Sequence, residues 1–198
     1  MTSFATLRNL ARKPAESERC DMCGAALAVD HQHLLDPPAQ KLICTCDACS
    51  VLFYQNGETK HKRVPRRVRA LPDFQLTDAQ WDSLLIPIGL AYFVDSSPHN
   101  KVLAFYPSPA GATESTLSLE SWFEIVQENP VLAFMEPDVE ALLVNRLDHA
   151  GEYFVAPIDK CYQLVGLIRS NWRGLSGGTD VWEKIGEFFS TLRAAASA

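Results

Sequence analysis

Two closely spaced cysteine pairs near the N-terminus constrain this chain more than any other sequence feature. Cys20 and Cys23 form one C-x2-C pair, and Cys46 and Cys49 form a second after 22 intervening residues. Each pair places two sulfur atoms on one side of a tight turn, and two such turns together make a tetrahedral four-thiolate cage. The spacing therefore predicts a metal site with these four ligands, in a zinc-ribbon-like module over residues 20–56.

The cage predicts a structural metal. Zinc is expected because a closed four-thiolate site without nearby catalytic groups is its usual structural use. Iron in the same cysteines, as a single ion or an iron–sulfur cluster, is the alternative and would make an electron-transfer protein. A closed cage leaves no coordination position for a substrate, so we predict no catalytic residue and no enzyme activity. Strands are expected at 41–45, leading into the second pair, and at 51–54, leaving it.

Three further residues could take part in the metal site. Side chains two apart in a strand share a face, so Cys44 is expected beside Cys46 near the metal, unless it fills the apolar core. His31 and His33 lie between the cysteine pairs. Either histidine could replace a cysteine ligand, or could support a ligand through a hydrogen bond.

Composition places the chain among ordinary globular proteins. Hydrophobic residues make up 47% and charged residues 21% of its 198 residues, which is enough apolar content to bury a core. No run of about 18 uncharged apolar residues is present, so membrane insertion is not expected. The first residues lack the apolar stretch of a secretory signal, so a cytoplasmic location is predicted. In that reducing compartment, clustered cysteines favour metal binding over disulfides.

Charge is divided unevenly along the chain. Residues 1–69 carry 11 Lys/Arg against 7 Asp/Glu, whereas residues 70–198 carry 7 against 17. Much of the positive charge falls in the segment 57–74, which we predict to be a basic linker. Its basic side chains are predicted to bind an acidic protein partner or to fold over the chain's own acidic half: Lys60, Lys62, Arg63, Arg66, Arg67 and Arg69. Nucleic-acid binding is a weaker alternative because no aromatic residues interleave with them.

The remainder of the chain, residues 75–198, is predicted to be an acidic α+β domain of helices and antiparallel strand pairs. Apolar and aromatic runs separated by turn residues predict two strand pairs: 88–94 with 102–106, and 139–147 with 153–158. Helices are expected after the capping residue Thr77, near Ser118, after Asp159 and from about Thr179.

Three other segments carry simpler predictions. Residues 1–19 lack periodicity and are expected to be a flexible tail. Residues 107–115 are rich in Pro, Gly, Ser and Thr and predict a loop. The carboxylates of Glu136, Asp138 and Glu140 are expected to form a solvated acidic edge.

Several motifs together resemble a known family. They are Cys-Asp-Met-Cys-Gly at 20–24, His-Gln-His-Leu-Leu-Asp at 31–36, Cys-Thr-Cys-Asp-Ala-Cys at 44–49, Phe-Tyr-Pro-Ser-Pro-Ala-Gly-Ala-Thr-Glu-Ser at 105–115 and Trp-Arg-Gly-Leu-Ser-Gly-Gly at 172–178. The chain resembles, over about residues 20–193, an uncharacterised bacterial family, a domain of unknown function associated with nickel–iron uptake hydrogenase gene clusters. The resemblance implies a hydrogenase accessory, maturation or associated protein, and carries over no catalytic residue.

Taken with the cysteine cage and the charge division, this resemblance predicts a non-catalytic accessory protein. Its structural zinc would stiffen the N-terminal module, and a protein partner, a hydrogenase subunit or a maturation factor, would dock on the molecule. For the metal, the resemblance rests on the four paired cysteines, with Cys44 and His33 as additional matches.

Overall fold

The structure, a computed structural model, describes residues 18–54, 60–115, 119–147, 151–174 and 176–197. It contains helices and two antiparallel sheets, so the predicted α+β class is confirmed. The tail predicted over residues 1–19 lies, except for its last two residues, outside the described part of the chain. Within the described residues, no helix has the length and apolar character needed to cross a membrane.

The larger sheet has the strand order β4-β9-β8-β5-β6-β7, with every neighbouring pair antiparallel. Its strands are β4 (Arg69–Ala70), β5 (Leu90–Ser96), β6 (Lys101–Ser108), β7 (Gly111–Ser115), β8 (Glu140–Asn145) and β9 (Glu152–Pro157). Both predicted strand pairs are present, as β5 with β6 and β8 with β9. The predicted loop at 107–115 is wrong in part, because β7 pairs with β6, and sheet pairing overrides weak strand propensity.

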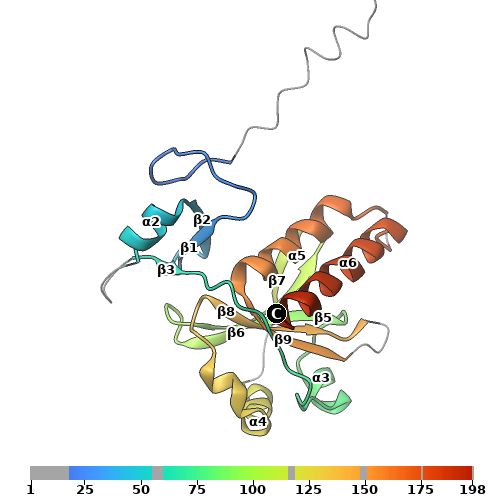
Figure 1. The fold of residues 1–198 in the computed structure, drawn as a ribbon. Coiled ribbons are helices and arrows are strands. Elements are labelled where there is room, and N and C mark those ends of the chain that lie inside the picture. The colour runs from blue at the N-terminus through green and yellow to red at the C-terminus, as the bar shows by residue number, and fades with distance from the viewer. Residues whose placement is uncertain (1–17, 55–59, 116–118, 148–150, 175, 198) are drawn as a thin grey trace, which may run out of the picture.

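The centre of this sheet is buried on both faces, which explains the apolar runs of β5 and β8. Along β5, Leu90, Tyr92 and Val94 enter one hydrophobic cluster, whereas Ala91 and Phe93 enter another. Successive strand side chains point to opposite faces, so each cluster belongs to one face. The result is a three-layer body with helices on both sides of the sheet (Figure 1).

Different helices cover the two faces. On one face pack the amphipathic helices α5 (Ile158–Asn171) and α6 (Thr179–Ala196), whose buried residues share a cluster with Tyr92. On the other face lie α3 (Asp78–Ser83), α4 (Leu119–Glu128) and the 3-10 helix η1 (Pro130–Phe134). The predicted cap at Thr77 is confirmed, since it forms a capping box with Gln80 at the start of α3.

The N-terminal module is built on a smaller three-stranded sheet with the order β2-β1-β3. Its elements are β1 (Gln32–Asp36), β2 (Lys41–Thr45), α2 (Asp47–Leu52) and β3 (Lys62–Arg63). β2 has the bounds predicted from the sequence. The strand predicted at 51–54 is wrong, because α2 begins directly after Cys46 and runs through Leu52. In the structure Cys46 caps α2, and the first turn of this helix brings Cys49 to the same side as Cys46.

The predicted linker joins the two sheets by taking part in both. β3 completes the small sheet beside β1, and β4 adds an edge strand beside β9. Val64 and Val68, between these strands, are buried in the same cluster as Leu35 of β1 and Phe154 of β9. The module therefore packs directly on the body along this segment (Figure 1).

Candidate metal centre

The first cysteine pair lies on a tight turn at the outer end of the module. The Gly24 amide donates to the carbonyl of Cys20, and the Cys20 amide donates to the carbonyl of Ala25, both at 2.8 Å. Gly24 has φ of +74°, a left-handed conformation that glycine adopts without steric cost. An isolated bridge between Arg19 and Ala26 closes the base of this turn.

The second pair lies where β2 passes into α2. Cys46 is the N-cap residue of α2, and its carbonyl accepts a hydrogen bond from the Ser50 amide at 2.9 Å. Cys49 lies in the first turn of the helix and is buried. The Asp21 amide donates to the carbonyl of Cys44 at 2.9 Å, which holds the first turn against β2.

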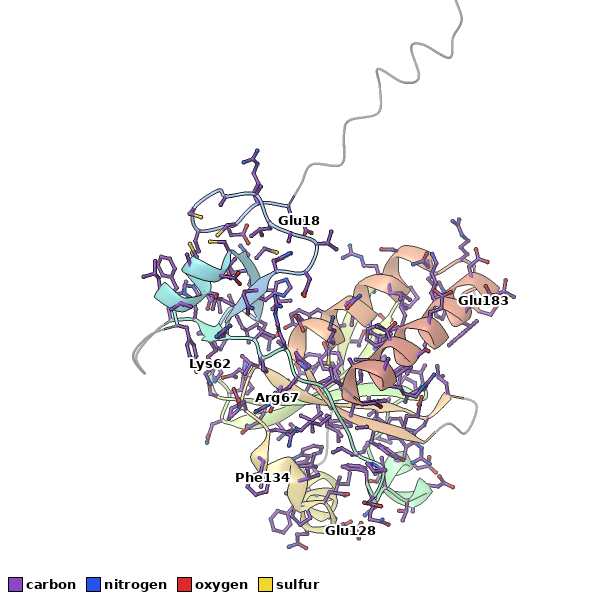
Figure 2. The ribbon with its side chains drawn as sticks, viewed as in Figure 1. Glu18, Lys62, Arg67, Glu128, Phe134 and Glu183 are labelled. Atoms are coloured by element: carbon purple, nitrogen blue, oxygen red, sulfur yellow. The ribbon has the colours of Figure 1, made fainter. Side chains whose placement is uncertain are left out.

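The four sulfur atoms converge on one point. The Sγ atoms of Cys20, Cys23, Cys46 and Cys49 all lie within 4.8 Å of one another. Cys23 and Cys46 Sγ are 3.8 Å apart, and a tetrahedron with metal–sulfur bonds of about 2.3 Å has edges of about 3.8 Å. All four thiols are free of disulfides. The residues therefore fit one tetrahedral metal ion, and Figure 2 shows sulfur atoms gathered beside α2.

The protein environment shifts the pKa values of two cage thiols in opposite directions. Burial acts to raise the pKa of Cys20, but backbone amides of Cys46, Cys23 and Met22 donate to its sulfur and lower the pKa to about 6. Burial and the neighbouring thiols raise the pKa of Cys49 to about 12. Since the thiolate is the metal ligand, Cys20 is prepared to bind at neutral pH, whereas Cys49 must lose a proton.

Cys44, His31 and His33 form a separate group rather than part of the cage. One ring nitrogen of each histidine and the Cys44 Sγ lie within 4.8 Å of one another. Burial, with the carboxylates of Asp21 and Glu18, raises the pKa of Cys44. The four sulfurs of the cage come from the paired cysteines. Cys44, which was expected beside Cys46 near the metal, is grouped with the two histidines.

The basic side chains of the linker contact the protein's own polar groups. The closest contacts are Lys60 with Asp36 at 2.8 Å, Lys62 with Asp138 at 2.6 Å, Arg63 with Gln32 at 3.4 Å, Arg66 with Asp30 at 3.3 Å, Arg67 with Glu136 at 2.6 Å and Arg69 with Glu140 at 3.8 Å. Figure 2 labels Lys62 and Arg67 along the path from the module to the body. Binding of a partner by these six residues stays a prediction.

The acidic edge predicted at Glu136, Asp138 and Glu140 is only partly solvated. Glu140 is fully buried; its carboxylate accepts from Arg67 Nε at 2.9 Å and from the Glu136 amide at 2.9 Å. Asp138 is 5% exposed and accepts hydrogen bonds from Ser97. The expectation is wrong for these two carboxylates because the basic linker covers them.

Sequence reasoning missed the site role of two carboxylates. Asp21 accepts a hydrogen bond from the Cys44 amide at 2.8 Å, although its place inside the first cysteine pair could have drawn attention to it. Asp159, in the first turn of α5, lies 3.0 Å from His33 Nδ1 across 126 residues of sequence. No local signal predicts that second contact, because only the packing of the module on the body creates it.

Comparison with known proteins gives a family without an assigned activity. The chain belongs to the family described as "Family of unknown function (DUF5947)", whose model matches residues 19–196. No curated protein and no solved structure matches the chain.

Proposed function

We propose that the four-cysteine cage holds a structural zinc ion and that the protein is a non-catalytic accessory protein of the cytoplasm. The observation that carries this proposal is the convergence of Cys20, Cys23, Cys46 and Cys49 within 4.8 Å. A four-thiolate tetrahedron satisfies zinc completely and leaves no position for a substrate, which is the arrangement of structural zinc sites.

The size of the cage favours a single ion over a cluster. An iron–sulfur cluster spreads its thiolates around several iron atoms, whereas these sulfurs lie within reach of one ion. A single iron remains the alternative metal, and it would make the protein an electron carrier. Zinc is preferred because the module has a thin apolar core, and a redox-inert ion that contributes folding energy meets that need.

The second cysteine pair leads into an apolar surface suited to a protein partner. Val51, Leu52, Phe53 and Tyr54, at the end of α2 and just after it, have 42–67% of their surface exposed. Contiguous exposed apolar side chains of this kind mark protein–protein contacts. The cage fixes the start of α2, so the metal would hold this surface in place and the basic linker would flank it.

The partner that we propose is a nickel–iron hydrogenase subunit or maturation factor. The support for this choice is the resemblance of the cysteine, 105–115 and 172–178 motifs to the family associated with hydrogenase gene clusters. The hydrogenase would be contacted through the end of α2, with the predicted linker residues contributing charge.

Metal identity is tested by elemental analysis and an absorption spectrum of protein purified without oxygen. The expected result is zinc in the cage and no visible absorption. Iron with visible thiolate-to-metal bands would replace the accessory role with electron transfer.

The partner is tested by affinity capture from a native extract that contains the hydrogenase. Wild-type protein is expected to retain a hydrogenase subunit or maturation factor, and a Leu52→Ser, Phe53→Ser variant is expected to lose it. Phe134→Ser removes a more exposed ring, 73% exposed against 42% for Phe53, from η1 and serves as the control. Capture by neither protein, or equal capture by both, would contradict the proposed docking surface.

A further inference from the structure

The register of the small sheet places a second group of metal-binding side chains on one face. His33 in β1 lies directly opposite Cys44 in β2, so their side chains share a face and are close neighbours. His31 precedes His33 by two positions and lies on that same face, with its ring 4.7 Å from the His33 ring. The sheet thus assembles two imidazoles and one thiol.

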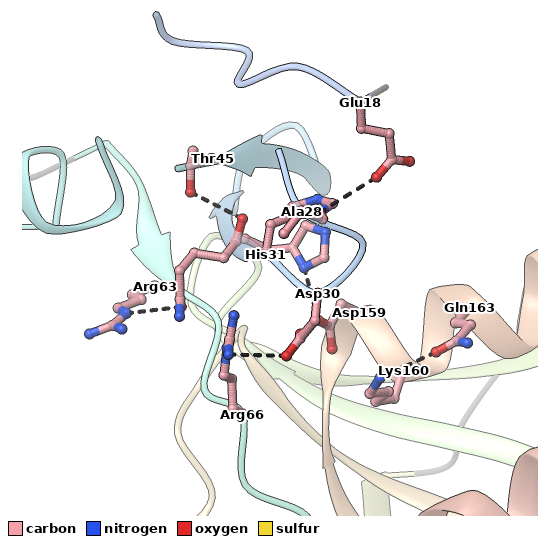
Figure 3. A network of polar contacts seen from close by, with 12 residues as sticks. Glu18, Ala28, Asp30, His31, Thr45, Arg63, Arg66, Asp159, Lys160 and Gln163 are labelled. Carbon is pink, nitrogen blue, oxygen red and sulfur yellow. Dashed lines mark hydrogen bonds and ion pairs between the residues drawn. The ribbon is translucent and has the colours of Figure 1, made fainter. Parts of the chain in front are cut away.

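Hydrogen bonds orient both imidazoles for metal binding. Nδ1 of His31 lies 2.9 Å from the carbonyl oxygen of Ala28, which only accepts, so this nitrogen carries the proton. Nδ1 of His33 lies 3.0 Å from a carboxylate oxygen of Asp159. Metal-binding histidines usually donate one ring N–H to a carbonyl or carboxylate, which fixes the tautomer and frees the other nitrogen. Both rings meet that condition through Nδ1, which leaves Nε2 for an ion; Figure 3 labels His31 and Asp159 in this network.

The free nitrogen of His31 lacks a partner among the residues that the structure describes. The His31 side chain is only 7% exposed, and its Nε2 is buried with no hydrogen bond to any of these residues. Buried polar atoms in native proteins are nearly always paired. In the described part of the chain, Asp159 Oδ1, on the carboxylate that contacts His33, is also buried without a partner. An ion bound at Nε2 would satisfy the unpaired nitrogen of His31.

We propose that His31, His33 and Cys44 form a second metal site, distinct from the four-cysteine cage, for a divalent ion of the zinc class. Two imidazoles and one thiolate leave the fourth tetrahedral position for water or an exogenous ligand, as in zinc sites with three protein ligands. Asp159 is a positioning residue that accepts from His33 Nδ1 and so leaves Nε2 for the ion. The proposal does not depend on what the cage binds.

The second site lies beside a groove on the protein surface. His31, His33 and Asp159 line a groove of about 1190 Å³ between the module and helices α5 and α6. An ion or a small anionic ligand can reach the fourth position from this groove. Glu18, 3.6 Å from His31 Nδ1, adds negative charge at its rim. Four thiolates fill the coordination of the cage, whereas three protein ligands leave one position open at the second site, so the ion of the second site would exchange more readily.

The site also links the two parts of the molecule. All three ligands belong to the module, whereas the carboxylate that orients His33 belongs to α5 of the body. Binding of an ion would strengthen the polarised His33–Asp159 hydrogen bond, and would thereby tighten the module against the body.

The test is a titration of the metal-free full chain with cobalt(II), whose absorption reports the number of thiolate ligands. Wild-type protein is expected to bind a cage equivalent with strong thiolate charge-transfer absorption and a second, weaker-absorbing equivalent. The His31→Ala, His33→Ala double variant is expected to lose the second equivalent and keep the first. His99→Asn removes a histidine of the β5–β6 turn and is expected to change nothing.

A Cys23→Ser, Cys46→Ser variant separates this proposal from that of the cage. It is expected to lose the strong absorption and keep the weaker equivalent. Binding of a single equivalent by wild type, unchanged stoichiometry in the histidine variant, or loss of the cage absorption in that variant would overturn the second site. Asp159→Asn is expected to weaken the second equivalent at least tenfold, as substitutions of groups that orient metal ligands usually do.

Discussion

The N-terminal module and the six-stranded body reach a stable structure by different means. The body buries apolar side chains on both faces of its sheet, including the fully buried Leu143 and Phe189. Within residues 18–54, the buried hydrophobic residues are Cys20, Leu34, Leu35, Ile43 and Cys49. Two of these five are cage cysteines, so much of what the module buries is the four-cysteine cage.

The difference shows how a small unit can be ordered without a large core. Below about 70 residues an apolar core alone rarely suffices, and metals are a common substitute. The module also uses the body, since Leu35 belongs to the body's cluster and His33 contacts Asp159. Its outer turns, which carry the four cysteines, lie farthest from that support (Figure 1).

Removal of a metal from the cage is expected to have the largest effect. It tests most directly whether the module depends on the metal while the body does not. Chelation, or Cys49→Ser, is expected to abolish amide protection across the cysteine turns while strands β5 and β8 stay protected. The physical reason is that structural zinc contributes about 10–16 kcal/mol of binding free energy in small zinc modules. Hydrogen exchange measured by residue checks this outcome.

A core substitution in the body tests the same difference from the other side. Leu143→Ala is expected to destabilise the body by about 2–5 kcal/mol through a core cavity, while metal stoichiometry is unchanged. Equal loss of protection in both regions after chelation would show that module and body unfold as one unit.

Removal of an arginine that joins the two regions should have an intermediate effect. Arg67→Met leaves the fully buried carboxylate of Glu140 without its closest cationic partner, and an expected loss of about 1–3 kcal/mol follows. Urea unfolding measures it, and a smaller loss is expected when Glu140→Gln is combined with Arg67→Met.

Arg63→Met is the matched control for this linker position, because the Arg63 side chain donates to the neutral side chain of Gln32. A loss in Arg67→Met no greater than the loss in Arg63→Met would contradict a special role for the buried carboxylate.

The smallest effect should depend on pH. Lys60, through its hydrogen bond and charge, lowers the pKa of Asp36 from the ordinary value of 3.8. A carboxyl with a lowered pKa contributes stability above its unfolded pKa, and that contribution is lost as the pH falls through its folded value. Lys60→Met is therefore expected to lower the melting temperature at neutral pH, with the difference shrinking as the pH falls below 3.8 and vanishing below the lowered folded pKa of Asp36.

Lys160→Met provides the comparison for that measurement, since Lys160 contacts the neutral side chain of Gln163. A Lys60→Met difference that persists unchanged into strong acid would mean that packing, and not the carboxylate, carries the effect.

Much of the fold could be predicted because its signals are local. The apolar runs of β5, β6, β8 and β9 and the capping box at Thr77 depend on neighbouring residues. The predictions at 51–54 and 107–115 were wrong because propensity was outweighed by context. In the first, α2 begins at the second cysteine pair and continues through Leu52; in the second, β6 supplies backbone partners to β7.

The sequence by itself determined the four-cysteine site and the α+β class, because two C-x2-C pairs and the apolar periodicity act over a few residues. The tertiary structure decided what lies around that site. It separated Cys44 from the cage, set the linker's basic groups against buried carboxylates and brought Asp159 to His33. These contacts depend on strand register and on packing between distant segments, and a one-residue shift in register would reverse the face of every side chain in the strand.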